Sequence, residues 1–152
     1  MNAVMPSTGN LYIIVGYDGS VPAARALDTA AALLSGREGS IEVLYVAHLT
    51  TAEMMSAAAI AEVESSFDEI ARDLRAQASD QLRGREERWT FERGQGIITD
   101  VLIGEAEKIR DGHPDDNVAI VVGSSSQAMH RLVGSVAVSL ARRATVPVVI
   151  VP

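Results

Sequence analysis

Cysteine is absent from the 152 residues, which excludes disulfides, thiolate metal sites and a cysteine nucleophile and is consistent with a reducing compartment. Lysine is nearly absent as well, because Lys108 is the single lysine among 13 basic residues. No segment approaches the roughly 18 consecutive apolar residues of a membrane span. Met1 to Asn10 has neither the basic region nor the apolar run of a secretion signal. We therefore expect a cytoplasmic protein that does not associate with membranes.

Acidic residues outnumber basic ones by 20 to 13, which gives a formal net charge of −7. Basic residues do not cluster in the sequence beyond a pair such as Arg142 and Arg143, so nothing indicates the positive patch of a nucleic-acid-binding protein. A chain of 152 residues with 47% hydrophobic content is large enough for one domain with a substantial core. We predict a single domain over residues 11–152, preceded by a short extension over residues 1–10.

Short apolar runs alternate with longer amphipathic segments along the chain. Five runs have the length and composition of strands: Leu11 to Val15, Ile41 to Ala47, the residues around Trp89 and Phe91, Val118 to Val122, and Val148 to Val151. Four segments have apolar residues at helical spacing: Val21 to Leu34, about Thr51 to Arg83, Ile97 to Ile109, and Leu132 to Ala144. This alternation predicts an α/β fold with an open, five-stranded parallel sheet. Charges alternate with the aromatic residues around Trp89, so that strand is expected at a sheet edge, with Trp89 beneath the long second helix.

Ligands of such sheets bind at the carboxyl ends of the strands, where the strand order reverses. Three loops are expected to meet there: Tyr17 to Ser20, Ala47 with His48, and Gly123 to Ser135. A strand that ends in glycine and serine before a helix is a frequent anion-binding arrangement, although the same glycines could serve only as turns. Neither a G-x-G-x-x-G fingerprint nor a Walker loop follows the first strand, and Asp18 would repel a pyrophosphate, so an NAD or FAD dehydrogenase is disfavoured.

Residues for catalysis are scarce. The three histidines, His48, His113 and His130, are isolated without metal-ligand spacing, and no G-x-S-x-G elbow is present. We therefore predict that the protein is not an enzyme.

Several segments together resemble the universal stress protein family over about Leu11 to Val151. They are Tyr17-Asp18-Gly19-Ser20, Leu44-Tyr45-Val46, the Gly94 region, Val121-Val122-Gly123-Ser124, Leu132-Val133-Gly134-Ser135-Val136 and Pro147 to Val151. The resemblance implies a Rossmann-like fold of the adenine nucleotide alpha hydrolase type, with strand order 3-2-1-4-5 and helices on both faces. It also implies a role in the stress response and a homodimer joined through the last strand, whose apolar edge would otherwise be an association hazard.

Part of this family binds ATP or AMP through a pattern written G-x2-G-x9-G-[S/T]. Gly123 matches its first glycine, and Gly134-Ser135 matches its last pair. The middle departs from the pattern, because Ser126 stands at the second glycine position and the stretch between Gly123 and Gly134 is two residues shorter than in the pattern. A shorter loop without that glycine puts the phosphate end of the site in doubt.

The resemblance also implies a role for each residue of the site. Asp18 would contact the nucleoside, the Val46 backbone would bond the adenine edge, and Gly123 would form the pocket floor. Gly134, Ser135 and Val136 would offer N–H donors to a phosphate, with Ser124 and Ser126 as further hydroxyls. His130 and Arg131, which the family pattern does not specify, could supply positive charge to the phosphate. Two alternatives stay open: Asp18 as a residue that only forms its own turn, and Arg131 as an exposed residue of the helix start with no ligand.

Two functions follow from this interpretation. The first is a sensor that binds ATP or AMP, with or without Mg²⁺, in a degenerate and weak site. A monophosphate is expected to fit better than a triphosphate. The second is an interaction protein of the same fold and dimer with a vestigial site and no cofactor, acting through protein partners that the sequence does not identify.

Overall fold

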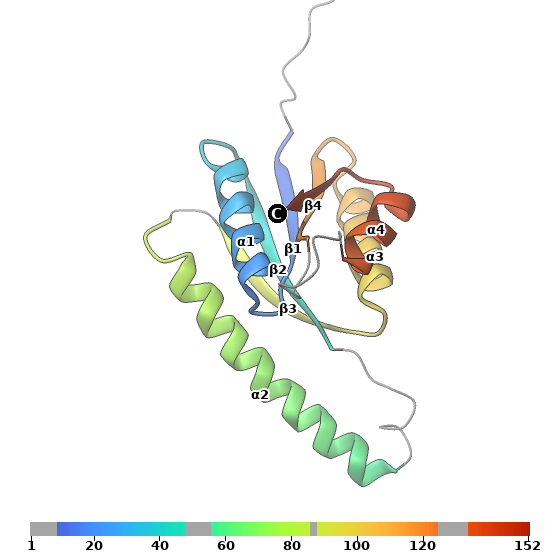
Figure 1. Cartoon of the computed structure of the whole chain (residues 1–152). Helices are drawn as coiled ribbons and strands as arrows, with labels where there is room; N and C mark the ends of the chain where they lie inside the picture. The colour runs from blue at the N-terminus through green and yellow to red at the C-terminus, as the bar shows by residue number, and fades with distance from the viewer. Residues whose placement is uncertain (1–8, 48–55, 86–87, 125–133) are drawn as a thin grey trace, which may run out of the picture.

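A computed structural model describes residues 9–47, 56–85, 88–124 and 134–152 (Figure 1). The described chain alternates strands and helices throughout. Its elements are β1 (Leu11–Gly16), α1 (Val21–Leu34), β2 (Gly39–Ala47), α2 (Ala57–Gln81), β3 (Trp89–Gln95), α3 (Ile98–Gly112), β4 (Asn117–Gly123), α4 (Ser135–Arg143) and β5 (Val148–Val151). The predicted α/β alternation is therefore confirmed, and in the described residues no helix is long and apolar enough to cross a membrane.

The five strands form one parallel sheet in the order β3-β2-β1-β4-β5, as predicted. The first strand is central, since Ile13 pairs with Ile41 of β2 on one side and with Ala119 of β4 on the other. The strand of Trp89 lies at an edge, in agreement with its alternating charges. This order places the reversal of the sheet between β1 and β4.

Both faces of the sheet are covered, so its central strands are apolar in continuous runs. On one face, Ile13, Val15 and Tyr17 of the β1 region pack with buried residues of α1 and α2. On the other face, Ile14 and Ile120 pack with buried residues of α3 and α4. Figure 1 shows α1 and the α3–α4 pair on opposite sides of the strands.

The start of α1 follows its sequence signals. The Ser20 hydroxyl accepts a hydrogen bond from the Ala23 N–H at 3.3 Å, and Pro22 stands in the first turn, where its missing N–H costs nothing. The second strand begins at Gly39, two residues before the predicted start. A Cβ there would lie 1.8 Å from the Leu11 carbonyl oxygen, so only glycine permits this approach of β2 to β1.

The long helix differs most from expectation. Its described part runs from Ala57 to Gln81, while the predicted start at about Thr51 falls within residues 48–55, which lie outside the described residues. The apolar stripe predicts a buried face, yet only Leu74 and Ala78 are buried and Ile70 is 42% exposed. Figure 1 shows why: the amino-terminal half of α2 projects beyond the sheet. Trp89 does pack on the same side as α2, as predicted.

The projecting half of α2 is tied to the sheet by one arginine. The Arg93 guanidinium of β3 forms an ion pair with Asp68 and stands 5.7 Å from the centre of the Phe67 ring. The carboxyl-terminal half is held instead by Gln81, whose amide donates to the Ala24 carbonyl and to Asp28 of α1. The two halves of α2 thus have different attachments.

Candidate functional site

The strand order reverses between β1 and β4, and ligands of such sheets bind at the carboxyl ends of the strands beside this point, which we call the crevice. After β1 and β2 the chain passes to the face of α1 and α2, whereas after β3 and β4 it passes to the face of α3 and α4. The helices that follow β1 and β4, α1 and α4, therefore lie on opposite faces of the sheet, and ligands of such sheets bind between two strands of this kind.

Val46 lies at the β2 side of this crevice. The pairing of β1 with β2 ends at Gly16 and Leu44, where the Tyr17 N–H donates to the Leu44 carbonyl at 3.0 Å. The Ala47 carbonyl bonds the other neighbour, since it accepts from the Gly96 N–H at 3.1 Å. Because alternate residues of a parallel strand bond to opposite neighbours, the Val46 N–H and C=O are directed to the β1 side, beyond the end of that pairing. A planar ring with a donor and an acceptor on one edge could bond there.

Gly123 lies at the β4 side of the crevice. The pairing of β1 with β4 ends at Val15 and Val121, so Gly123 also extends past the end of the central strand. A Cβ on Gly123 would lie 2.6 Å from both the Cβ and the carbonyl carbon of Pro22. Glycine is therefore required for the start of α1 to pack against the end of β4. Val46 and Gly123 stand on the two flanks of the β1 end.

Backbone hydrogen bonds join Ser124 to both β5 and α4. The Ser124 N–H donates to the Val151 carbonyl at 2.8 Å, and the Ser124 carbonyl accepts from the Gly134 N–H at 2.5 Å. Gly134 is the N-cap of α4, so this bond fixes the helix start beside the end of β4. The Gly134 N–H is thereby engaged within the chain. The first bond within α4 runs from the Val138 N–H to the Gly134 carbonyl, so the N–H groups of Ser135, Val136 and Ala137 have no acceptor within the helix.

Asp18 is exposed and turns back on its own loop. Its Oδ1 accepts a hydrogen bond from the Ser20 N–H at 3.0 Å, the geometry of an Asx turn. The next residue, Gly19, has φ +77°, and a Cβ there would meet Leu74 Cδ2 at 2.6 Å. Asp18 therefore shapes the β1–α1 loop through Oδ1. The turn does not use its second carboxylate oxygen. Beside it, burial together with the Asp18 charge raises the pKa of the Tyr17 hydroxyl.

A second carboxyl group on β2 has an unusual environment. Glu42 is half-buried on the face covered by α3, and its Oε1 is buried without a hydrogen-bond partner. Burial, followed by the nearby charges of Glu105 and Glu92, raises the pKa of Glu42 to about 7, against a smaller opposing effect of Lys108. Glu42 lies four residues before Val46 on the same strand. The sequence marks it only as the one charge in an apolar strand.

Three predicted or considered positions cannot be placed. Ser126, His130 and Arg131 lie within residues 125–133, outside the described residues. Among the described residues no group of three or more acidic or histidine side chains could hold a metal ion. His113 lies at the opposite end of the sheet, 3.4 Å from Asp116.

The residue that sequence reasoning missed is Pro22. It was treated only as a helix-start residue, but it packs on Gly123.

The comparison with family models settles the relationship of this chain. The model of the universal stress protein family matches residues 12–152. The chain belongs to the universal stress protein family. The family assignment drawn from the sequence motifs is thereby confirmed, whereas a comparison with curated proteins finds no match.

Solved structures of universal stress proteins have the same fold. The chain is similar to the universal stress protein UspA from Lactobacillus plantarum, with 19% identity, a TM-score of 0.74 and coverage of 95% of this chain and 99% of that one. A universal stress protein in complex with cAMP has 22% identity and a TM-score of 0.64 over 93% and 97% of the two chains. A family member from Arabidopsis thaliana with AMP bound has 15% identity and a TM-score of 0.61 over 93% and 90%.

Proposed function

We propose that this chain is a sensor that binds an adenine nucleotide weakly in the crevice over the end of β1. The observation that carries the proposal is the pair of backbone edges that flank the crevice. On one side of the crevice the Val46 N–H and C=O lie beyond the end of the β1 pairing. On the other side the Gly123 backbone also lies beyond it. Adenine presents a donor and an acceptor on one edge, which matches a strand backbone without any side chain.

Ligands of structural relatives support the same class of compound. One universal stress protein of the same fold is in complex with cAMP, and another has AMP bound. Both are nucleoside monophosphates. The fold alone does not transfer their ligands to this chain at 15–22% identity, so the proposal depends on the crevice residues described above.

The phosphate end of the crevice favours one phosphate over three. Ser135 and Val136 supply outward N–H groups at the positive end of α4, which suits a single phosphate. The Gly134 N–H is already bonded to Ser124, and the chain between Gly123 and Gly134 is short for the family pattern. We therefore expect AMP or cAMP to bind more tightly than ATP.

We further propose that the protein acts as a homodimer through β5. Val148 to Val151 form an edge strand of four apolar residues, all half-buried, whose outer side has no neighbouring strand in the described chain. An apolar edge of this kind is stabilised by pairing with a second copy. Signalling in the stress response would then follow from contacts with partner proteins in the cytoplasm, without catalysis.

A second candidate function rests on polar groups of the crevice that are already hydrogen-bonded within the chain. Asp18 Oδ1 and the Gly134 N–H, two of the predicted contacts, are bonded within the chain. This favours a dimeric interaction protein whose crevice binds no nucleotide.

Isothermal titration with AMP, cAMP and ATP, each with and without Mg²⁺, separates the two candidates. Saturable binding with AMP or cAMP tighter than ATP supports the sensor. No heat with any of the three, from a protein shown to be a folded dimer, rejects the sensor and supports the interaction protein. The oligomeric state is measured separately by sedimentation, so failure of the dimer does not count against the crevice.

A further inference from the structure

The outer edge of β3 carries backbone groups that the sheet does not use. In the described chain β3 is the last strand on its side and pairs only with β2. Two bonds show which residues face β2: the Ile41 N–H donates to the Arg88 carbonyl at 2.8 Å, and the Gly96 N–H donates to the Ala47 carbonyl at 3.1 Å. Alternate residues of a parallel strand bond to the same neighbour. The N–H and C=O groups of the residues between them are therefore directed outward, at Trp89, Phe91, Arg93 and Gln95.

This outer edge is long and open. Its outward backbone groups have no hydrogen-bond partner in residues 9–47, 56–85, 88–124 and 134–152. The neighbouring helix α2 packs mainly on α1 and β2. The edge strand β3 has seven residues, whereas β5 at the other edge has four. A free edge of this length is a template for a further strand.

The two faces of β3 differ in chemistry. Trp89 and Phe91 are half-buried and pack with the core on the side of α1 and α2. Thr90 and Glu92 alternate with them, so they lie on the opposite face, where both are exposed. Residues opposite each other on neighbouring strands share a face. An added strand would therefore place apolar side chains beside the aromatic rings and polar ones beside Glu92.

Acidic residues from three elements gather on the α3 side of this edge. Burial, followed by the charges of Glu105 and Glu92, raises the pKa of Glu42 to about 7, against a smaller opposing effect of Lys108. Lys108 is itself 3.3 Å from Glu105. Thr90 pairs with Glu42 in the sheet and is short, so a long side chain on an added strand could reach Glu42 across it. Basic side chains are therefore favoured on this face.

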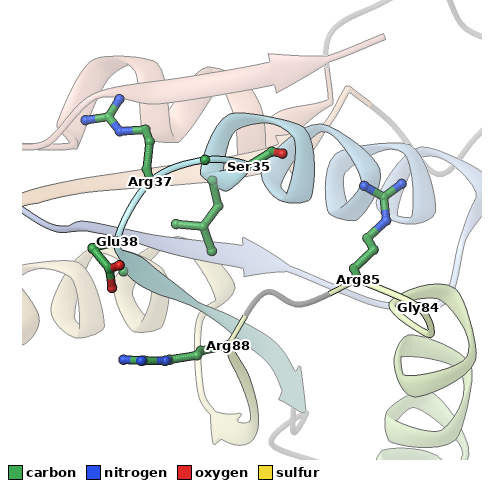
Figure 2. Close-up of a pocket in the computed structure, with 9 residues that line it drawn as sticks. Ser35, Arg37, Glu38, Gly84, Arg85 and Arg88 are labelled. Atoms are coloured by element: carbon green, nitrogen blue, oxygen red, sulfur yellow. The ribbon is translucent and has the colours of Figure 1, made fainter.

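Arg88, which precedes β3, does not cancel this acidic character. It lines a pocket at the start of the strand together with Glu38 of the α1–β2 turn (Figure 2). Glu92 is four residues further along, roughly 13 Å away in a strand. Glu86 and Glu87, which lie outside the described residues, are acidic as well. The charge beside Glu92 therefore stays negative.

A second copy of the chain fits this edge less well than a basic strand. Pairing of two β3 strands would bring the acidic faces of both copies together, each with its own Glu92 and Glu42. Each chain also has a formal net charge of −7. A strand of alternating basic and apolar residues avoids this repulsion and complements both faces of β3.

We propose that the outer edge of β3 binds an extended segment of a partner protein, with alternating basic and apolar residues, as a sixth strand of the sheet. Backbone bonds to Trp89, Phe91 and Arg93 would attach the segment, and Glu92 would select its basic face. The crevice lies between β1 and β4, and β5 forms the other edge. Binding at β3 is therefore independent of the nucleotide and of pairing through β5.

Hydrogen exchange measured by NMR, without nucleotide, tests the pairing. The probe is a capped peptide of alternating lysine and valine with the seven-residue length of β3. We expect it to slow exchange of the outward amides of Phe91 and Arg93 at least about tenfold, with little change at Glu92 and Gly94, which β2 already protects. The matched peptide of alternating glutamate and valine should not produce this alternating pattern.

The variant Glu92→Lys tests the charge of the edge. Affinity for the lysine peptide is measured by the fluorescence of Trp89, the single tryptophan, and should fall at least about fivefold as attraction becomes repulsion. The control Asp115→Lys makes the same charge change at an exposed residue before β4 and should alter affinity less than about twofold. The wild type should bind the peptide more tightly at pH 8 than at pH 6, because Glu42 ionises over this range, and Glu42→Gln should reduce this difference.

Four results would overturn the proposal. Fluorescence that does not saturate would show that the peptide has no site, and equal losses in Glu92→Lys and Asp115→Lys would show a response to net charge. Exchange slowed equally at inward and outward amides would show general stabilisation without pairing. Slow exchange of the outward amides that depends on protein concentration without peptide would show that a second copy occupies the edge. Unchanged exchange of the β1 amides verifies that each variant is folded.

Discussion

Gly123 and Pro22 are in contact across the junction of β4 and α1, so closely that a methyl group on Gly123 would lie 2.6 Å from the Pro22 Cβ. Backbone atoms of Pro22 are equally near, so a rotamer change cannot relieve the clash. We expect Gly123→Ala to lower the free energy of unfolding by about 1–3 kcal/mol through overpacking. Urea denaturation followed by circular dichroism measures this change.

Gly104→Ala is the control for that prediction. Gly104 lies within α3, and a Cβ there would meet no atom within 4 Å. Alanine is the better helix former, so this variant should be more stable by about 0.5–1 kcal/mol. Equal stability changes in the two glycine variants would show that the contact with Pro22 is not specific.

Substitution of Gly134 by leucine tests the phosphate end of the crevice. The side chain would extend from the N-cap of α4 beside the N–H groups of Ser135 and Val136. We expect loss of AMP binding in isothermal titration, with an unchanged dimer in sedimentation because β5 is not affected. Unchanged affinity would show that the nucleotide does not bind at the start of α4.

Two variants of Asp18 distinguish its structural role in the turn from a contact with the nucleotide. In Asp18→Asn the side-chain oxygen can still accept from the Ser20 N–H, so stability should stay within about 0.5 kcal/mol, whereas Asp18→Ala loses the Asx turn and about 1 kcal/mol. If Asp18 also bonds the nucleoside as an acceptor through its second oxygen, both variants should weaken AMP binding. Affinity that follows stability alone, with Asp18→Asn unchanged, would leave Asp18 as a turn residue only.

Glu42 predicts a pH dependence of stability with a definite sign. Its pKa rises from 4.5 to about 7 on folding, mainly through burial. The folded state therefore binds the proton more tightly than the unfolded state, and this contribution is complete below pH 4.5 and lost as the pH rises through 7. The full shift corresponds to about 3 kcal/mol, which we reduce to about 1–2 kcal/mol because water reaches part of the side chain.

The variant Glu42→Gln isolates this contribution. It cannot ionise, so the difference in unfolding free energy between variant and wild type should shift in favour of the variant between pH 5 and pH 8. Taking the difference removes the titration of the histidines, which both proteins share. A difference that stays constant over this range would contradict a raised pKa at Glu42.

The sequence predicts the strands well because strands covered on both faces are continuously apolar, as in Ile13 to Val15. Periodicity did not supply the strand order, which came from the resemblance of motifs such as Gly134-Ser135. The early start of β2 at Gly39 was missed. Glycine is required there because the Leu11 carbonyl of the neighbouring strand leaves no room for a Cβ. Such approaches between distant segments have no local pattern.

The exposed half of α2 illustrates another limit. The stripe from Ile60 to Leu74 predicts an apolar face, but a stripe does not determine what lies opposite it. The 25-residue helix extends about 37 Å, longer than the roughly 30 Å of β2. Part of the stripe must therefore project beyond the sheet. In the same way, the motif at Gly134 predicts a helix start but not that Ser124 accepts its N–H.

The central place of β1 has a consequence for synthesis on the ribosome. The Asn10 N–H donates to Asp116 across 106 residues, and β1 pairs with β4 only after that residue has been made. Until then the growing chain carries β1 with one edge unpaired, which can pair with other nascent chains. Closing so long a loop is also slow. The free edge of β1 is therefore protected only once β4 has been synthesised.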